Sequence, residues 1–124
     1  MAKRDLTGAV NFAHLERYAG GDQALVEEVL GLFREQAAMW VRLLDPAAPG
    51  QAWKDAAHSL KGSALGIGAF ALADECEMAE QAPAGLAERT RLLELVRDAL
   101  QAALADISAY EHEMLLRSLK TPKS

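Results

Sequence analysis

The chain has 124 residues, the usual size of one domain, and 51% of them are apolar, which is enough for a hydrophobic core. A net charge of −5 excludes nucleic-acid binding through a basic stripe, and no apolar run approaches the roughly 20 residues that cross a bilayer. The single cysteine, Cys76, excludes an internal disulfide and a cysteine metal site. Since no signal peptide is recognisable, we expect a cytoplasmic protein.

The composition favours helices, because Ala and Leu are strong helix formers and few β-branched residues compete with them. A short helix is predicted over residues 11–18, before Gly20-Gly21. Asp22 is the predicted N-cap of a second helix, because its carboxylate can accept a hydrogen bond from a free amide of the first turn. This helix extends to about residue 44, and the prolines and glycine of residues 45–50 then break the chain.

Three more helices are predicted in the rest of the chain. The third covers residues 51–65, and Gly66 and Gly68 supply its C-terminal stop. The fourth ends at residues 82–85, where a proline and a glycine follow each other closely, and the last covers residues 86–119.

Apolar residues recur in steps of three and four along these helices, as on the packed side of an amphipathic helix. In the second helix they are Leu25, Val29, Leu32, Phe33, Trp40 and Leu43. In the third they are Trp53, Ala57, Leu60, Ala64 and Ile67, and in the fourth Leu72, Cys76 and Ala79. Because short loops make long helices antiparallel neighbours, we expect an all-α fold, an antiparallel up-down-up-down four-helix bundle with a short extra N-terminal helix. Residues 1–124 form one domain in this prediction, with frayed ends at residues 1–9 and 120–124.

His58 is the candidate reactive residue. On a helix it lies at the edge of the apolar stripe, directly after Ala57. Side chains on the same face, three, four or seven positions away, are Lys54, Lys61, Gly62 and Leu65. The two lysines can offset the negative charge of an incoming phosphoryl group. A neutral imidazole in such surroundings is suited to nucleophilic attack on phosphorus through a ring nitrogen.

Gly62 is unexpected inside a helix, because glycine there costs up to about 1 kcal/mol relative to alanine. Four positions after His58, its missing Cβ leaves space beside the imidazole for a phosphoryl group with a partner protein behind it. The alternative is that Gly62 and Gly66 allow another helix to pack closely.

Glu80 is the candidate partner of the imidazole. If the chain reverses near Ala69, the position 11 residues before it faces the position 11 residues after it, which pairs His58 with Glu80. A carboxylate there can accept from one ring N–H, fix the tautomer and leave the other nitrogen free. Gln81 is the alternative if the register differs by one residue.

These residues resemble the phosphoacceptor helix of histidine phosphotransfer (HPt) domains, whose pattern is approximately His-x-Leu-Lys-Gly-x-Ser/Ala-x-x-Leu/Ile-Gly-Ala. The chain matches the pattern with His58, Leu60, Lys61, Gly62, Ala64, Ile67, Gly68 and Ala69. A Leu-x-x-x-Cys-x-x-x-Glu run continues the likeness with Leu72, Cys76 and Glu80, and upstream matches are Gly21-Asp22, Leu25, Phe33 and Trp53. The likeness covers residues 10–81 by motif and departs from the family at Ala79, where a larger apolar residue is common.

The resemblance implies a phosphorelay protein. A receiver-domain phosphoaspartate, or a sensor histidine kinase, passes a phosphoryl group to His58, and a response regulator takes it away. Members of the family use no cofactor or metal of their own, because the receiver supplies Mg²⁺, and this sequence has no metal-ligand cluster. We expect a monomeric phosphocarrier, not an enzyme that turns over alone, with the receiver docking on apolar surface around His58 that includes Leu65 and exposed residues of the second helix.

Of two alternative functions, one stays open and the other is excluded by the sequence. A binding module that keeps the bundle and does not transfer phosphate remains an alternative, although the histidine, lysine and glycine of the acceptor motif disfavour it. A histidine kinase core is excluded, because the chain has no room for a nucleotide-binding domain. The plainer interpretation of Lys54 and Glu80 is a solvated surface residue, and His14 and His112 are interpreted as surface residues.

Overall fold

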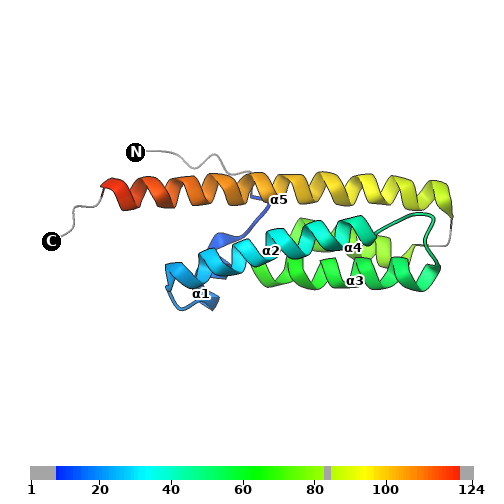
Figure 1. Cartoon of the computed structure of the whole chain (residues 1–124), viewed down its shortest axis with the longest axis horizontal. Helices are drawn as coiled ribbons and strands as arrows, with labels where there is room; N and C mark the ends of the chain where they lie inside the picture. The colour runs from blue at the N-terminus through cyan, green and yellow to red at the C-terminus, as the bar shows by residue number, and fades with distance from the viewer. Residues whose placement is uncertain (1–7, 83–84, 121–124) are drawn as a thin grey trace.

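A computed structural model of the chain describes residues 8–82 and 85–120, and in these two ranges every regular element is a helix (Figure 1). The helices are α1 (Phe12–Tyr18), α2 (Gln23–Leu43), α3 (Gly50–Ile67), α4 (Phe70–Gln81) and α5 (Leu86–Lys120). The all-α class predicted from the sequence is confirmed. The predicted boundaries are close, and the largest difference is that α3 extends two residues further, to Ile67.

The four longer helices pack side by side, and α1 lies near the end where α2 begins (Figure 1). Each of α2, α3 and α4 contacts the next helix in the chain, and α5 closes the arrangement by contacting α2. The C-terminal end of α5 projects beyond the other helices. No helix in the described part of the chain is long and apolar enough to cross a membrane.

Local signals fix where the helices begin and end. Asp22 caps α2 as predicted, because its Oδ1 accepts from the Leu25 amide at 3.2 Å. Gly68 ends α3 in the left-handed region, with φ of 80°. A Cβ at Gly68 would approach the Asn11 carbonyl oxygen to 2.9 Å, and the Asn11 amide donates to the Gly68 oxygen at 3.0 Å. Gly66, also expected to be part of this stop, lies inside the helix, so Gly68 alone supplies it.

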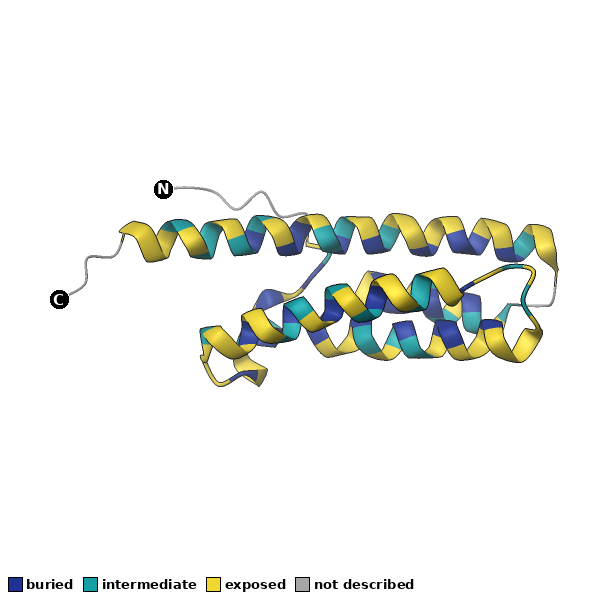
Figure 2. Ribbon diagram, in the orientation of Figure 1, coloured by how far each residue is buried: buried dark blue, intermediate teal, exposed yellow. Residues whose placement is uncertain are grey.

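The core lies where the helices face one another, as the buried residues in Figure 2 show. The predicted apolar stripes of the third and fourth helices are confirmed, because all eight of their residues are buried. Cys76 is one of them, and burial raises the pKa of its thiol to about 12, which agrees with a core residue and not a reactive one.

The predicted apolar stripe of the second helix is partly wrong. Three of its members are exposed: Leu25, Leu32 and Leu43. Phe33 is buried as predicted, and Val29 and Trp40 are partly buried against the core. The other buried residues of α2 are Val26, Leu30 and Ala37, which the prediction did not include. Both sets repeat at helical spacing, and only the contacts that α2 makes with α3 and α5 decide which one enters the core. The other set leaves an apolar stripe on the outer side of α2.

A buried tryptophan ties α3 to its neighbours. The Trp53 indole N–H donates to the Ala79 carbonyl oxygen at 2.6 Å, which joins the first part of α3 to the end of α4. The Arg89 guanidinium lies 5.2 Å from the Trp53 ring and donates to the Pro46 and Ala48 carbonyls. The contact with Ala79 matters for the site, because it helps to fix the register between α3 and α4.

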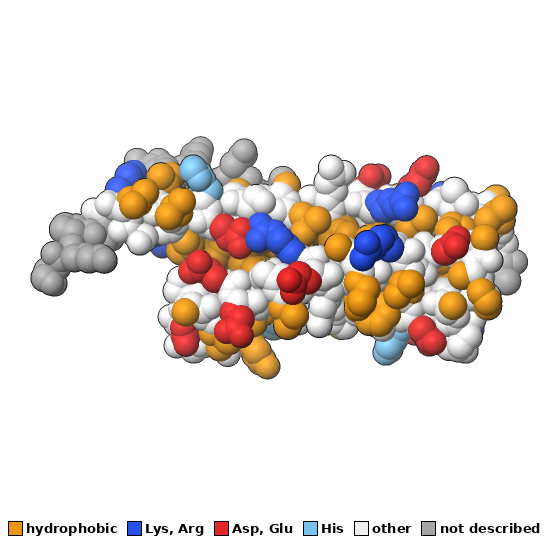
Figure 3. All heavy atoms as spheres, viewed as in Figure 1, with side chains coloured by type: hydrophobic (Ala, Val, Ile, Leu, Met, Phe, Trp, Pro, Cys, Tyr) orange, Lys and Arg blue, Asp and Glu red, His pale blue; other side chains and the backbone are white. Residues whose placement is uncertain are grey.

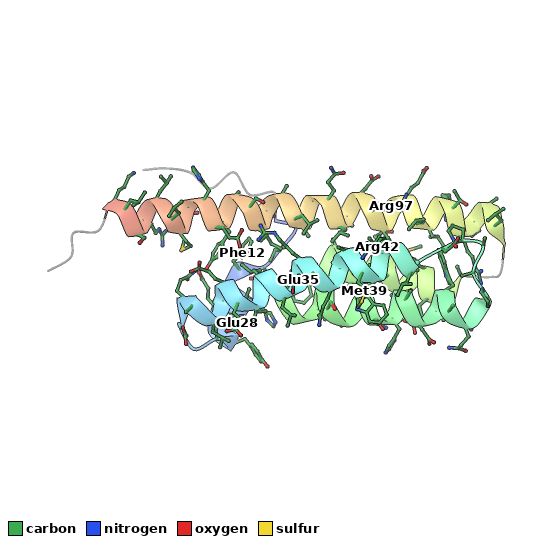
Figure 4. The ribbon with its side chains drawn as sticks, in the orientation of Figure 1. Phe12, Glu28, Glu35, Met39, Arg42 and Arg97 are labelled. Carbon is green, nitrogen blue, oxygen red and sulfur yellow. The ribbon has the colours of Figure 1, made fainter. Side chains whose placement is uncertain are left out.

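The segment before α1 packs on α5. The Ala9 amide donates to Asp106 Oδ2 at 2.8 Å, and Phe12 stacks on Tyr110 with ring centroids 4.2 Å apart (Figure 4). Of the ends predicted to be frayed, residues 1–7 and 121–124 lie outside the described part of the chain. Lys120, also placed in that prediction, is the last residue of α5.

Candidate functional site

His58 lies on the outer side of α3, with 68% of its side chain exposed. Its Nδ1 is 3.1 Å from Glu80 Oε2 on α4. The predicted pairing of these two residues across the turn between α3 and α4 is therefore present. When Nδ1 carries the hydrogen and donates to Glu80, the lone pair of Nε2 is available on the other side of the ring.

Glu80 stays ionised through its neighbours. Burial by itself raises the pKa of this carboxyl, but the Lys61 ammonium and the His58 ring outweigh burial, so the pKa lies below its ordinary value. An ionised acceptor at this position favours the tautomer of His58 with hydrogen on Nδ1.

Lys61 lies between two carboxylates of α4. Its Nζ is 2.8 Å from Glu77 Oε2 and 3.2 Å from Glu80 Oε1, and Glu80 in turn contacts the His58 ring. The hydrogen bond to Glu77 and then the bond to Glu80 raise the pKa of Lys61. That Lys61 offsets the charge of an incoming phosphoryl group stays a prediction.

Gly62 is exposed, and a Cβ built on it would meet no atom within 4 Å. The same holds for Gly66, so the alternative in which these glycines permit close packing of another helix is wrong. The fold does not require glycine at position 62. The space beside the imidazole is open in the isolated chain. A phosphoryl group and its donor would need such an open space.

The other three expected site residues are Lys54, Gln81 and Leu65, and they differ in their contacts. Lys54 is exposed on α3, and no ion pair joins it to another described residue. Gln81 does not replace Glu80, because its Nε2 donates to Glu77 Oε1 at 3.0 Å. Leu65 has 45% of its surface exposed, two turns along α3 from His58.

Glu77 is the site residue that the sequence interpretation missed. It accepts hydrogen bonds from both Lys61 and Gln81. The signal was present: the reversal that pairs His58 with Glu80, 22 residues later, also pairs Lys61 with Glu77, 16 residues later. Applying the hairpin register to every polar residue of α3 would have found it.

An apolar groove lies next to the acceptor helix. It has a volume of about 470 Å³ and is lined by residues of α1, α2 and α3, among them His14, Tyr18, Leu32, Phe33, Ser63 and Gly66. His14, expected to be a plain surface residue, packs edge-on against Phe70 at 5.6 Å between ring centroids. Within residues 8–82 and 85–120, no three His, Cys, Asp or Glu side chains are grouped to hold a metal ion.

Comparisons with known proteins agree with this geometry. The family model described as the Hpt domain matches residues 24–109. Among solved structures, the chain is similar to the histidine phosphotransferase ShpA from Caulobacter crescentus, with 54% sequence identity and a TM-score of 0.74. That match covers 91% of this chain and 100% of the other. A search of curated proteins found no match. With a model that covers His58, Glu80 and the four longer helices up to residue 109, the chain belongs to the Hpt domain family.

Proposed function

We propose that His58 accepts a phosphoryl group on Nε2 and passes it on. As an Hpt domain, the chain has a histidine phosphotransfer role in a phosphorelay, and this proposal names the residue and atom that carry it out. The observation that carries the assignment is the hydrogen bond between His58 Nδ1 and Glu80 Oε2, made by a ring that is 68% exposed. One nitrogen is held and the other faces an approaching partner.

The transfer step needs only the ring and its carboxylate. The Nε2 lone pair forms the bond to phosphorus while the bond from phosphorus to the aspartate oxygen breaks, and the aspartate carboxylate leaves with that electron pair. Nδ1 keeps its hydrogen, so the ring takes a positive charge. Glu80 is positioned to stabilise this charge, because its ionised carboxylate already accepts the Nδ1–H bond.

The partners that fit this step are response regulator receiver domains and a sensor histidine kinase, with Mg²⁺ supplied by the receiver. Phosphoryl transfer depends mainly on positioning and charge neutralisation, so a carrier needs few groups of its own. We interpret the chain as a monomeric phosphocarrier of the cytoplasm without independent turnover. In our interpretation its fold is an antiparallel up-down-up-down bundle of α2 to α5, with α1 as a short addition.

The receiver is proposed to dock on the side of the bundle that carries His58. The exposed apolar surface that could serve the contact includes Leu65 on α3 and, on α2, Leu32, which lines the groove between α1, α2 and α3. Figure 3 shows apolar side chains gathered over α2 between charged ones. An apolar patch rimmed by charges is typical of a protein–protein contact.

The test is transfer from a phosphorylated receiver domain to the wild type and to His58→Gln. We expect acid-labile, base-stable label on the wild type and none on the variant, with an unchanged far-UV circular dichroism spectrum. His112→Gln is the matched control, because this exposed histidine lies on α5 away from α3. Absence of label on the wild type with a panel of receivers and kinases would favour the non-transferring binding module. Label on His58→Gln would place the acceptor elsewhere.

A further inference from the structure

Glu77 competes with the acceptor site for its nearest cation. The Lys61 ammonium donates a hydrogen bond to Glu77 Oε2 at 2.8 Å. Its distance to Glu80 Oε1 is 3.2 Å, so the ammonium is shared between the two carboxylates. The shorter contact goes to Glu77, although Glu80 is the residue that contacts His58.

The position of Glu77 is itself supported. Gln81, one turn later on α4, donates to Glu77 Oε1 at 3.0 Å, so both carboxylate oxygens have a donor. The Lys61 side chain is only 22% exposed, against 44% for Glu77. Lys61 thus lies along the surface between α3 and α4, with its charge directed to α4.

Phosphorylation changes the charge at this place strongly. Two carboxylates and one ammonium give the cluster of Lys61, Glu77 and Glu80 a net charge of −1 beside a neutral ring. A phosphoryl group brings roughly two more negative charges. Lys61 lies three residues from His58 on the same helix face, so Glu77 and a phosphoryl group on His58 would compete for its charge.

We propose that Glu77 is a positioning residue that holds Lys61 away from the acceptor ring and thereby makes the phosphoryl group on His58 easier to pass on. This inference rests on His58 being the acceptor. Because Glu77 competes for the charge that would stabilise phosphohistidine, the phosphorylated carrier is less stable relative to the receiver phosphoaspartate. Glu77 thus sets the equilibrium of transfer and makes no contact with the reacting atoms.

The test measures the equilibrium ratio of phosphorylated carrier to phosphorylated receiver. Glu77→Gln keeps the shape of the side chain and removes its charge. We expect the ratio to rise about two- to fivefold, the range that pairs of exposed charges give. The tautomer of His58, read from its ring nitrogen chemical shifts, should stay as in the wild type, because Glu80 is intact.

Two further variants separate this role from a general effect of charge. In a Lys61→Gln background, Glu77→Gln should no longer change the ratio, since its effect acts through Lys61. Asp74→Asn removes the same charge one turn earlier on α4, where no ion pair to Lys61 is present among the described residues, and should leave the ratio near the wild-type value.

The outcomes are distinguishable from failure of the proposed function. A wild type that takes no label refutes His58 as the acceptor. A labelled wild type with the same ratio in Glu77→Gln overturns the positioning role. So does an equal shift in the Lys61→Gln background or in Asp74→Asn, since each would show that only the total charge matters.

Discussion

The inner and outer faces of α3 are made of residues that are neighbours in the chain but differ in how far they are buried. On the inner face, Trp53, Leu60 and Ile67 are at most 2% exposed and hold the bundle together. On the outer face, His58 has 68% of its side chain exposed, Leu65 is 45% exposed, and Gly62 carries no side chain. The residues that stabilise the fold thus alternate along α3 with those that we assign to transfer. Substitutions on the two faces should therefore have effects of different kinds.

The largest expected effect on stability comes from the inner face. Leu60→Ala removes a side chain that is 0% exposed and should lower the free energy of unfolding by about 2–5 kcal/mol. Leu65→Ala is the matched control, because it makes the same change on the outer face and should cost less than about 1 kcal/mol. Urea denaturation measures both. Equal costs would show that the two faces are not separate.

A smaller loss is expected at the end of α3. Gly68→Ala forces a left-handed φ of 80° on a residue with a Cβ and brings that Cβ to 2.9 Å from the Asn11 oxygen. We expect a loss of about 1–3 kcal/mol by denaturation. Gly66→Ala, inside the helix and in open space, should not be destabilising. If both variants lost the same amount, the turn would not depend on glycine.

The smallest effect on stability has the opposite sign. Gly62→Ala should raise the free energy of unfolding by about 0.5–1 kcal/mol, because alanine is the better helix residue and its Cβ meets no atom within 4 Å. Phosphoryl transfer should nevertheless slow, because the methyl group occupies the open space beside His58.

Gly31→Ala separates these two consequences. It makes the same change inside α2, also with no atom within 4 Å of the new Cβ. We expect it to stabilise the protein without slowing transfer. A Gly62→Ala variant that transfers at the wild-type rate would show that the open space beside His58 is not needed for transfer, and Gly62 would have no assigned role.

The sequence predicted those features that depend on residues close to each other in the chain. The inner stripe of α3 and the N-cap at Asp22 follow from spacing and local chemistry, and both are confirmed. The pairing of His58 with Glu80 was also within reach, because a tight turn at Gly68 and Ala69 fixes the register of the two helices that it joins.

What the sequence could not decide depends on contacts between distant segments. The second helix has two apolar stripes, and the choice of Val26 over Leu25 for the core depends on its packing against α3 and α5. The contact of Lys61 with Glu77 is a different case. The turn that pairs His58 with Glu80 also pairs these two residues, so the sequence contained this contact although the interpretation missed it.

The exposure of the His58 ring also bears on the lifetime of a phosphoryl group attached to it. With 68% of the side chain open and no side chain at Gly62, a phosphoryl group on Nε2 would stand in bulk water. The phosphorus–nitrogen bond would then be open to hydrolysis from the direction by which the receiver approaches. The lifetime of that bond sets the longest delay between the arrival of a signal and its delivery.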